Sequence, residues 1–432
     1  MENVANHATA LYSKPDNSAD GKTNGKPKAR DMAEQRAKLP AMAFENSARV
    51  STRAAMVIDM APKNILRAPL RAFKPYVAGK PIDEVRRELG LTGRIAKMAS
   101  NENPLGSSPK AIEAMHKAID DVYLYPDDNA YYLRKKIAEK HGVDIGTVYA
   151  ANGSVDILEL SVQAFVEPSD KVVTSEHTFA IYTLAAMKFG AQVSMAPMTD
   201  GGYRYDLPAI AKLIDERTKI VFLANPTNPT GTWFSAKEFD EFMAKVPEDV
   251  LVVYDSAYAE YCPHDDMPDA LKYFRAGRRI LCLRTFSKAY GLAGIRVGWA
   301  IGPTDIIHGL MTCRVSFSIN SVAQAAAMAA LDDDEFVVKS REINDSELAF
   351  LREGMAGLPV TMPPSRANFL LVDTKKNAQW LFEQLQRRGV IVRPMGGYGY
   401  PGAIRVNPWL REDNERFVKH LRELLESQEG DL

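Results

Sequence analysis

The sequence has few of the residues that stabilise small secreted proteins or hold metal ions. Its 432 residues include three cysteines, Cys262, Cys282 and Cys313, and no two of them form a Cys-x-x-Cys pair. An odd number without that spacing predicts neither a disulfide framework nor a zinc ribbon. Free cysteines are typical of a reducing compartment, so we expect a cytoplasmic protein.

Long apolar runs and an excess of one charge are missing as well. The longest apolar candidates, such as residues 250–254, have the length of a strand, whereas a membrane-spanning helix needs about 20 apolar residues. The 54 basic and 55 acidic residues nearly cancel, so the overall charge does not attract nucleic acid. We therefore expect neither a membrane nor a nucleic acid as a partner.

Signatures of metal sites and of serine hydrolases are also absent. The seven histidines show no His-x-x-x-His spacing, and no Gly-x-Ser-x-Gly elbow occurs. The one cluster of potential metal ligands, residues 262–266, is consecutive in sequence. Consecutive side chains rarely converge on one ion, so a solvated turn is the better interpretation and no metal is predicted.

What the sequence does contain is an alternation of strand and helix patterns. Short apolar runs rich in β-branched residues alternate with helical spacing, which is typical of an α/β domain with a largely parallel sheet flanked by helices. Ser235 and Glu238 form a capping box that predicts the start of one of these helices. The predicted strands are residues 171–174, 192–196, 220–224, 250–254, 280–284 and 297–301.

The two ends of the chain have different patterns. Residues 1–64 are predicted to be an N-terminal extension, disordered to about residue 30 and helical between Pro40 and Pro62. The order of elements after residue 332 predicts a smaller α+β domain. Its expected elements are a long helix, a strand at 368–372, a helix at 378–388, strands at 390–393 and 404–406, and a final helix from Glu412.

Gly397, Gly399 and Gly402 satisfy the Gly-x-Gly-x-x-Gly spacing of a dinucleotide-binding loop. That mechanism needs a helix after the glycines to hold a pyrophosphate. Here Pro401 leads into a strand-like run at 403–406 instead. We interpret the segment as a flexible loop beside a pocket.

Polar residues follow the predicted strands at the ends where α/β proteins build ligand sites. Asn152-Gly153-Ser154 precedes a helical pattern whose first amides could face a phosphate, although turns before helices commonly look alike. Asn225-Pro-Thr-Asn228-Pro-Thr-Gly231 follows the strand at 220–224. Its two X-Pro bonds stiffen the turn, and a merely rigid turn would explain them equally well.

Two further strand ends add an acid and a lysine. Asp255 follows one strand, with Tyr258 three residues later; a lone acid in that place is also often a helix cap. Thr285-Phe-Ser-Lys288 ends the next strand, with Arg296 close behind. Hydroxyls, a lysine, an arginine and an acid together are what a phosphorylated pyridinium aldehyde requires.

Four motifs resemble those of the class I/II (fold-type I) pyridoxal-phosphate-dependent aminotransferases, and most of all the histidinol-phosphate aminotransferase branch. The resemblance runs in order from about residue 69 to 425. It implies a large cofactor-binding domain at 105–332 and a small domain formed by residues 65–104 and 333–432. The motifs are Ser100-Asn-Glu-Asn-Pro-Leu-Gly106, residues 225–231, Tyr254-Asp-Ser-Ala-Tyr258 and residues 285–296.

The resemblance also implies a cofactor, pyridoxal 5'-phosphate, and a role for each matching residue. Lys288 matches the lysine that carries the cofactor as a Schiff base and moves the proton. Asp255 matches the acid that pairs with the pyridine nitrogen. Tyr258 and Asn228 match the residues that hydrogen-bond the phenolic oxygen, and Phe179 matches the aromatic residue that stacks on the ring.

The phosphate of the cofactor is expected to meet a cup of amides, hydroxyls and one cation. By resemblance these are Gly153, Ser154, Ser287 and Arg296. Tyr125 would complete the cup from the other subunit of a homodimer.

The substrate is expected to be held by Arg405, with Arg393 as a possible second arginine and Asn103 as a further contact. The family commonly continues its substrate arginine with Thr or Ser, an apolar residue and Gly. This chain has Val406-Asn407-Pro408-Trp409 after Arg405, and that departure leaves the substrate open.

The implied activity is ping-pong amino transfer from histidinol phosphate to an oxo acid, 2-oxoglutarate. An aromatic or other amino acid is the alternative donor, since an arginine binds a carboxylate as well as a phosphate. A decarboxylase of a phosphorylated amino acid would use the same Lys288 and Asp255. A regulator that only senses the cofactor would need an N-terminal helix-turn-helix, which residues 1–64 do not show.

Overall fold

The computed structural model describes residues 66–72, 79–262 and 266–431. Residues 68–432 form one compact unit, which contains every element named below. The predicted N-terminal extension, residues 1–64, lies outside the described residues, as does most of the predicted turn at 262–266.

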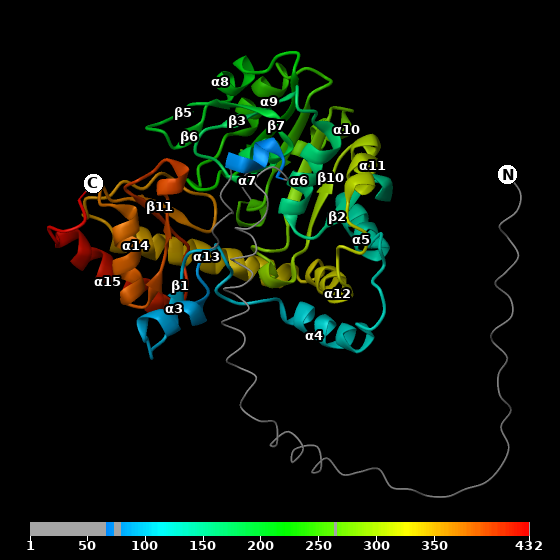
Figure 1. Cartoon of the computed structure of the whole chain (residues 1–432). Coiled ribbons are helices and arrows are strands. Elements are labelled where there is room, and N and C mark those ends of the chain that lie inside the picture. Colours follow the sequence, from blue (N-terminus) through cyan, green and yellow to red (C-terminus); the bar gives the residue numbers. More distant parts are fainter. Residues whose placement is uncertain (1–65, 73–78, 263–265, 432) are drawn as a thin grey trace, which may run out of the picture. The chain divides into compact units, whose positions relative to one another are not determined.

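A seven-stranded sheet forms the centre of this unit (Figure 1), in the order β2-β10-β9-β8-β7-β3-β4. Five neighbouring strands, from β9 to β4, are parallel to one another, whereas β10 is antiparallel to both β9 and β2. The predicted α/β fold with a mostly parallel sheet is confirmed. The strands are β2 (Val148–Ala151), β3 (Lys171–Ser175), β4 (Gln192–Ala196), β7 (Thr218–Ala224), β8 (Leu251–Asp255), β9 (Ile280–Thr285) and β10 (Gly298–Ile301).

The sheet is buried on both faces because alternate side chains of its strands enter two different cores. In β7, Ile220 and Phe222 pack with α6, α7 and α11, whereas Val221 and Leu223 pack with α8 and α9. A third apolar cluster joins β2 and β10 to α4, α5 and α12. These helices are α4 (Pro109–Ala118), α5 (Tyr131–His141), α6 (Ser154–Phe165), α7 (Ile181–Phe189), α8 (Leu207–Lys212), α9 (Ala236–Met243), α10 (Ala270–Arg275), α11 (Thr304–Cys313) and α12 (Ser321–Ala330).

All six strands predicted for the central sheet exist, with ends displaced by no more than two residues. The strand expected at 297–301 is β10, and it runs against its neighbours. Strand β2 was not predicted, because Val148-Tyr-Ala-Ala lacks the β-branched run that marks the other strands. All four of its residues are buried, so packing rather than local propensity makes this segment a strand.

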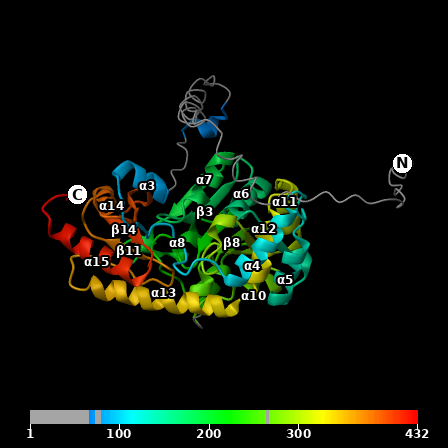
Figure 2. The same ribbon diagram turned by 90° about the horizontal axis from the view of Figure 1, so that it is seen from below.

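A smaller three-stranded antiparallel sheet, in the order β11-β14-β13, lies in the C-terminal part of the chain. Strand β1 pairs with β12, so the segment before residue 104 joins the C-terminal elements. The expected domain boundaries at 104/105 and 332/333 remain predictions. The elements are α3 (Ile82–Leu89), β1 (Ala96–Lys97), α13 (Asp334–Gly354), β11 (Leu370–Asp373), α14 (Ala378–Arg387), β12 (Val390–Ile391), β13 (Arg393–Pro394), β14 (Ala403–Val406) and α15 (Arg411–Glu426), and α13 runs beneath both parts in Figure 2.

Two sequence predictions in this part need correction in detail. The single strand expected at 390–393 is divided into β12 and β13, which belong to different sheets. The strand expected at 368–372 begins later, at Leu370. Asn368, just before it, makes a side-chain hydrogen bond to the backbone of Asn101.

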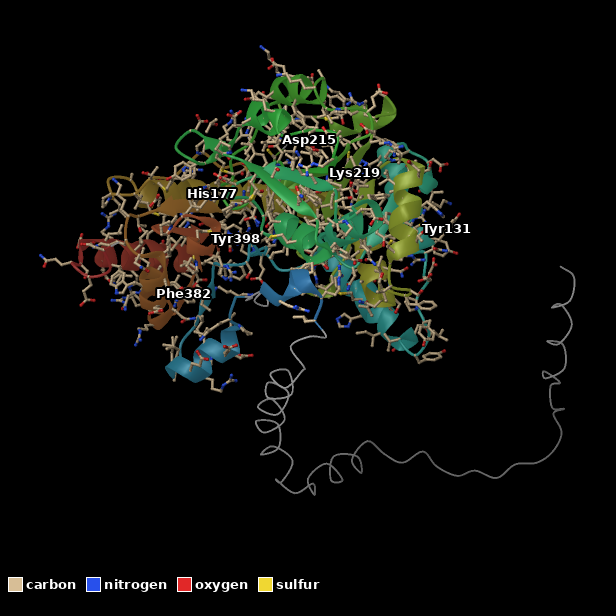
Figure 3. All side chains as sticks on the ribbon, turned by 45° about the horizontal axis from the view of Figure 1, so that its top comes forward. Tyr131, His177, Asp215, Lys219, Phe382 and Tyr398 are labelled. Atoms are coloured by element: carbon tan, nitrogen blue, oxygen red, sulfur yellow. The ribbon has the colours of Figure 1, made fainter. Side chains whose placement is uncertain are left out.

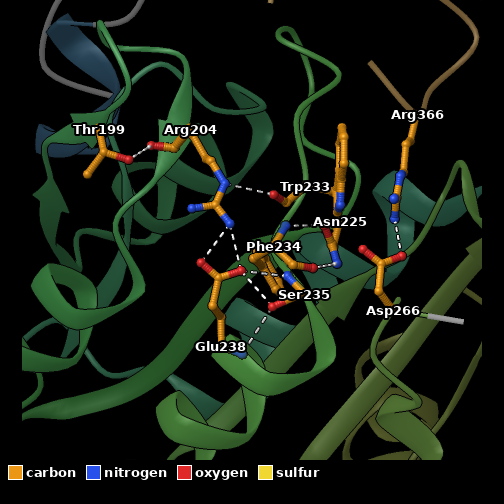
Figure 4. A network of polar contacts seen from close by, with 9 residues as sticks. All are labelled: Thr199, Arg204, Asn225, Trp233, Phe234, Ser235, Glu238, Asp266 and Arg366. Atoms are coloured by element: carbon orange, nitrogen blue, oxygen red, sulfur yellow. Dashed lines mark hydrogen bonds and ion pairs between the residues drawn. The ribbon is translucent and has the colours of Figure 1, made fainter. Parts of the chain in front are cut away.

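The predicted capping box starts helix α9, as expected. Ser235 Oγ accepts a hydrogen bond from Glu238 N, and the Glu238 carboxylate accepts one from Ser235 N at 2.8 Å. Arg204 donates to the same carboxylate at 2.6 Å and to the carbonyl of Trp233 at 3.0 Å (Figure 4). This network fixes the C-terminal end of the turn at 225–234. Asn228, earlier in the same turn, lines a cavity.

Candidate active site

A cavity of about 310 Å³ lies at the carboxyl ends of β7, β8 and β9 and is closed from the C-terminal part by residues of β13 and β14. This volume suits a small-molecule ligand. The residues predicted for the site that line the cavity are Ser154, Phe179, Asn228, Asp255, Tyr258, Ser287, Lys288, Arg296, Arg393 and Arg405.

Lys288 follows β9 and places its amine in this cavity. Its Nζ donates to the carbonyl of Ser100 at 3.2 Å and lies 5.9 Å from the centre of the Tyr258 ring. Burial, together with the positive charge of Arg405, lowers the pKa of Lys288 to about 8. A lysine with this pKa has a substantial neutral fraction near neutral pH, which is the form that attacks a carbonyl carbon.

Asp255 is the last residue of β8, and its carboxylate is buried, with 6% of the residue exposed. Its Oδ2 accepts a hydrogen bond from Tyr182 Oη at 2.8 Å, and its Oδ1 accepts one from Ala257 N at 3.1 Å. Burial raises the pKa of Asp255 to about 6, although the Tyr182 hydrogen bond opposes that rise. A buried carboxylate that lines a cavity is stabilised by a cation beside it, such as a protonated pyridine nitrogen.

The opposite end of the cavity is built for an anion. Gly153 is the N-cap of α6 with φ 89°, and a Cβ on it would lie 2.2 Å from Nη2 of Arg296. Arg296 Nη1 also donates to Ser287 Oγ at 3.2 Å. The free amides of a helix N-terminus, a guanidinium and two hydroxyls, those of Ser154 and Ser287, together match a phosphate.

The two arginines predicted to hold the substrate are neighbours on adjacent strands of the small sheet. Arg393 in β13 and Arg405 in β14 are register partners, and both side chains line the cavity. The Arg405 guanidinium donates to Asn228 Oδ1 and, at 2.9 Å, to the carbonyl of Ala99. It also lies over the ring of Phe369 at 5.2 Å, so an anion meets a guanidinium that is already oriented.

The turn after β7 is rigid and also reaches the ligand cavity. Both of its X-Pro peptide bonds are cis. Asn225 ties its two ends together by exchanging hydrogen bonds with the backbone of Phe234, each 3.1 Å long. Asn228 in the same turn lines the cavity, and its predicted contact with the cofactor stays a prediction.

The glycine motif at 397–402 is a loop beside the pocket, as the sequence predicted. Tyr398 of this loop lines the cavity. Its carbonyl accepts a hydrogen bond from His177 Nδ1 at 2.8 Å, and the two residues lie close together in Figure 3. Gly399 has φ 86°, and a Cβ there would lie 2.3 Å from the His177 ring, so the loop fits only with glycine at this position.

Three expected site residues do not line the cavity: Gly153, which contacts Arg296 beside it, Asn103 and Tyr125. The side-chain amide of Asn103 donates to the carbonyl of Ala289 at 2.9 Å and to Ser340 Oγ at 2.8 Å. Its neighbour in the same motif, Asn101, lines the cavity instead. Tyr125 is 83% exposed, and its ring packs on Phe317 at a centroid distance of 4.7 Å.

The structure adds residues that the sequence reasoning missed. Tyr182 lies on α7, one turn after Phe179, and its spacing resembles that of any buried helix residue. Asn101 and Asn103 belong to one motif, and only the fold shows which of them enters the cavity. Trp409, whose effect on the pocket was open, packs against the core between the small sheet and α15.

Two kinds of feature are absent from the residues that the structure describes. No helix in that part of the chain is long and apolar enough to cross a membrane. Within the same residues, no three His, Cys, Asp or Glu side chains come together as a potential metal site.

Comparison with known proteins gives a consistent result. Residues 94–421 match the family model described as aminotransferase class I and II. The chain is 45% identical over 357 residues to a histidinol-phosphate aminotransferase 2 of Pseudomonas aeruginosa, covering 82% of this chain and 96% of that protein. A histidinol-phosphate aminotransferase of an Anaeromyxobacter species is 47% identical over 355 residues, covering 82% and 97%.

A similar solved structure is the histidinol-phosphate aminotransferase of Sinorhizobium meliloti in complex with pyridoxal-5'-phosphate. Its TM-score is 0.77 at 26% identity, covering 85% of this chain and 99% of that one. The L-threonine-O-3-phosphate decarboxylase of Porphyromonas gingivalis, with a TM-score of 0.68 at 21% identity, shows a likeness of fold alone.

Proposed function

The chain belongs to the aminotransferase class I and II family, and on that premise we propose that it is a pyridoxal-phosphate-dependent transaminase whose amino donor is histidinol phosphate and whose acceptor is 2-oxoglutarate. The observation that carries the chemistry is the placement of Lys288, Asp255 and Arg296 around one cavity. The proposed donor is supported by the relatives of 45–47% identity, which bear that activity in their names.

The cavity fits the cofactor at each of its ends. Asp255 offers a buried carboxylate for the ring nitrogen, and Arg296 with the α6 amides offers a cup for the phosphate. When bound, the cofactor supplies an electron sink for the bond broken at the Cα of the substrate. Phe179 lines the same cavity and offers an aromatic face for the ring.

The residues of the chain then carry out the remaining tasks. Lys288 would hold the cofactor, and its amine, once released, would move the proton from the substrate Cα to the cofactor carbon. Tyr258 and Asn228 line the cavity as hydrogen-bonding partners for the phenolic oxygen. Arg405 and Arg393 bind the anionic groups of donor and acceptor, which lets one site serve both half-reactions.

We also propose that the enzyme is a homodimer in which Tyr125 reaches the phosphate cup of the other subunit. Two segments, residues 122–132 and 314–317, hold exposed apolar side chains. The ion pair between Arg314 and Asp128 joins them. Exposed apolar groups gathered in this way mark interaction surfaces. The exposed apolar residues are Val122, Tyr123, Leu124, Tyr125, Tyr131, Tyr132, Val315 and Phe317. Tyr131 of this group lies well apart from Tyr398, which lines the cavity (Figure 3).

A cytoplasmic setting is proposed from the cysteines. Cys262 and Cys282 are buried, Cys313 is half-buried, and all three are free thiols. Burial raises the pKa of the Cys282 thiol to about 12, so it is held in its unreactive form.

The donor is tested by mixing the purified, cofactor-loaded protein separately with histidinol phosphate, histidinol, phenylalanine and glutamate, and following the visible absorbance of the bound cofactor by stopped flow. A fast change with histidinol phosphate and a much slower one with histidinol is expected, because the phosphate meets the paired arginines. A response to phenylalanine alone among the donors would show an aromatic transaminase.

The reaction type is tested in the same preparation by product analysis. Amino transfer requires 2-oxoglutarate for a second turnover and forms glutamate. Continued release of carbon dioxide from a phosphorylated amino acid without any oxo acid would show a decarboxylase and overturn the proposed function.

A further inference from the structure

Asn101 lies in the wall of the cavity with its backbone in the left-handed region, and contacts from elsewhere in the fold hold it there. It is 2% exposed, and its φ is 55°, in the left-handed region. Asparagine enters this region more readily than most residues with a Cβ, so glycine and aspartate can replace it without a change of backbone.

Two buried side chains from the C-terminal part supply those contacts. Asn407, which directly follows β14, accepts a hydrogen bond from Asn101 N at 3.0 Å through its Oδ1. Asn368, which precedes β11, donates to the carbonyl of Asn101 at 3.1 Å. Asn407 is itself fully buried, and its backbone N donates to the carbonyl of Met98 at 3.0 Å.

The side chain of Asn101 held in this way touches a residue of the proposed machinery. Its Nδ2 donates to the hydroxyl oxygen of Tyr258 at 2.9 Å. A carboxamide nitrogen only donates, so the Tyr258 oxygen accepts this bond and its own proton is left for another acceptor. The charged and titratable groups around Tyr258 are Arg405, Asp255, Tyr398 and Lys288.

We infer that Asn101 is a positioning residue that directs the hydroxyl proton of Tyr258 toward the cofactor, and that Asn407 keeps Asn101 in place. The inference rests on the proposed function, because it takes Tyr258 as the donor to the phenolic oxygen of pyridoxal phosphate. Asn101 acts on the cofactor through Tyr258.

This role of Asn407 also accounts for the residues after Arg405, where the chain departs from the pattern of the family. The carboxamide of Asn407, which belongs to the departing segment Val406-Asn407-Pro408-Trp409, accepts a hydrogen bond from the backbone of Asn101. Trp409 is partly buried against the core of the small domain and does not line the cavity. The departure thus bears on the hydrogen bond to Tyr258 rather than on the wall that meets the substrate.

The test is a pH titration of the visible absorbance of the cofactor-loaded protein, with no substrate present. Asn101→Gly removes the carboxamide and leaves a residue that adopts positive φ without strain. When the Tyr258 hydroxyl no longer points its proton at the phenolic oxygen of the cofactor, that oxygen holds its own proton more tightly. The pH midpoint of the absorbance titration is therefore expected to rise by about half to one pH unit, which corresponds to the loss of one neutral hydrogen bond.

Asn407→Ala is expected to shift the midpoint in the same direction. Asn414→Ala is the matched control, because it removes another fully buried carboxamide, one that bonds to Trp409 and Glu347 and not to Asn101. A midpoint that moves as far in Asn414→Ala as in Asn407→Ala would overturn the role given to Asn407. If Asn407→Ala does not fold, the Asn101 variants decide alone.

Asn101→Asp separates hydrogen-bond direction from shape. Aspartate has nearly the same size and tolerates the same backbone, but its carboxylate accepts, so it would draw the Tyr258 proton away from the cofactor. A shift at least as large as in Asn101→Gly supports the inference. A wild-type midpoint in Asn101→Asp or in Asn101→Gly overturns it.

The inference and the proposed function fail in different ways. The titration uses no amino donor, so an error about histidinol phosphate leaves its outcome unchanged. A wild-type protein that shows no visible band with pyridoxal phosphate would overturn the proposed function itself.

Discussion

Lys288 and Asp255 are both strand-end residues whose pKa values are displaced toward neutrality. Burial is the main cause in both cases, and it disfavours the charged form of each. It lowers the pKa of Lys288 to about 8 and raises that of Asp255 to about 6. Displaced values of this kind are typical of residues that exchange protons in a reaction.

Lys288→Ala is expected to remove nearly all turnover, at least about 10⁴-fold, because the lysine both holds the cofactor and moves the proton. Steady-state glutamate formation measures this. Lys272→Ala is the matched control, since Lys272 pairs with Asp240 and does not line the cavity. Retained turnover in Lys288→Ala, or equal loss in both variants, would contradict the assignment.

The capture of the cofactor by the cofactor-free protein is expected to depend on pH through Lys288. Only the neutral amine attacks the aldehyde, and a pKa of about 8 means that this form increases as pH rises to 8 and is dominant above it. The second-order rate of the absorbance change should therefore rise about tenfold per pH unit well below pH 8 and level off above it. A rate that keeps rising to pH 10 would show that the lysine retains its ordinary pKa.

At the scale of elements, the N-terminus of α6 is the part of the site that requires glycine, at position 153. Gly153 gives the backbone a positive φ and leaves the space that Arg296 fills. Tyr182 on α7 donates a hydrogen bond to the Asp255 carboxylate. Each group thus depends on a helix that follows a strand of the central sheet.

Gly153→Ala is expected to weaken binding of pyridoxal phosphate by at least about tenfold, because about 1–2 kcal/mol of backbone strain is added and Arg296 is displaced from the cup. Fluorescence titration of the cofactor-free protein gives the dissociation constant. Gly142→Ala is the matched control: it has φ 62° at the end of α5, and its Cβ would meet no atom within 4 Å. Equally weak cofactor binding in both variants would show that backbone strain, and not displacement of Arg296, causes the loss.

The strand and helix pattern could be predicted from the sequence because each element has its own signal. The strands of the central sheet are short apolar runs, and Ser235 with Glu238 is a local device that needs no tertiary contact. Strand β2 could not be predicted, because Val148-Tyr-Ala-Ala becomes a strand only through burial between β10 and the helices.

At the scale of the whole molecule, the site needs residues from both parts of the chain. Asp255 ends a strand of the central sheet and Lys288 and Arg296 lie in the segment between β9 and β10, whereas Arg393 and Arg405 come from the small sheet. Helix α13 lies along both parts in Figure 2 and contacts α15 and the turn at Ala259–Tyr261. The proposed dimer would add Tyr125 of a second copy.

The dimer is tested by complementation between two inactive variants. In a mixed dimer of Lys288→Ala and Tyr125→Ala chains, one site carries both defects and the other carries neither. Refolding the two together from denaturant in equal amounts is therefore expected to restore up to about a quarter of wild-type activity. Activity no higher than the sum of the separate variants, in a preparation shown to contain mixed dimers, would show that Tyr125 serves its own subunit or no site.

The sequence by itself determined the alternation of elements, the mostly parallel sheet and the strand ends that carry Lys288 and Asp255, because these follow from local patterns and from the rule that parallel strands end at one edge. Only the tertiary structure decided which asparagine of the Asn101-Glu-Asn103 motif enters the cavity. It also decided that Tyr182 holds Asp255 and that Asn407 reaches Asn101. These contacts join residues 73 and 306 positions apart, and no local pattern in the chain encodes a pairing over that distance.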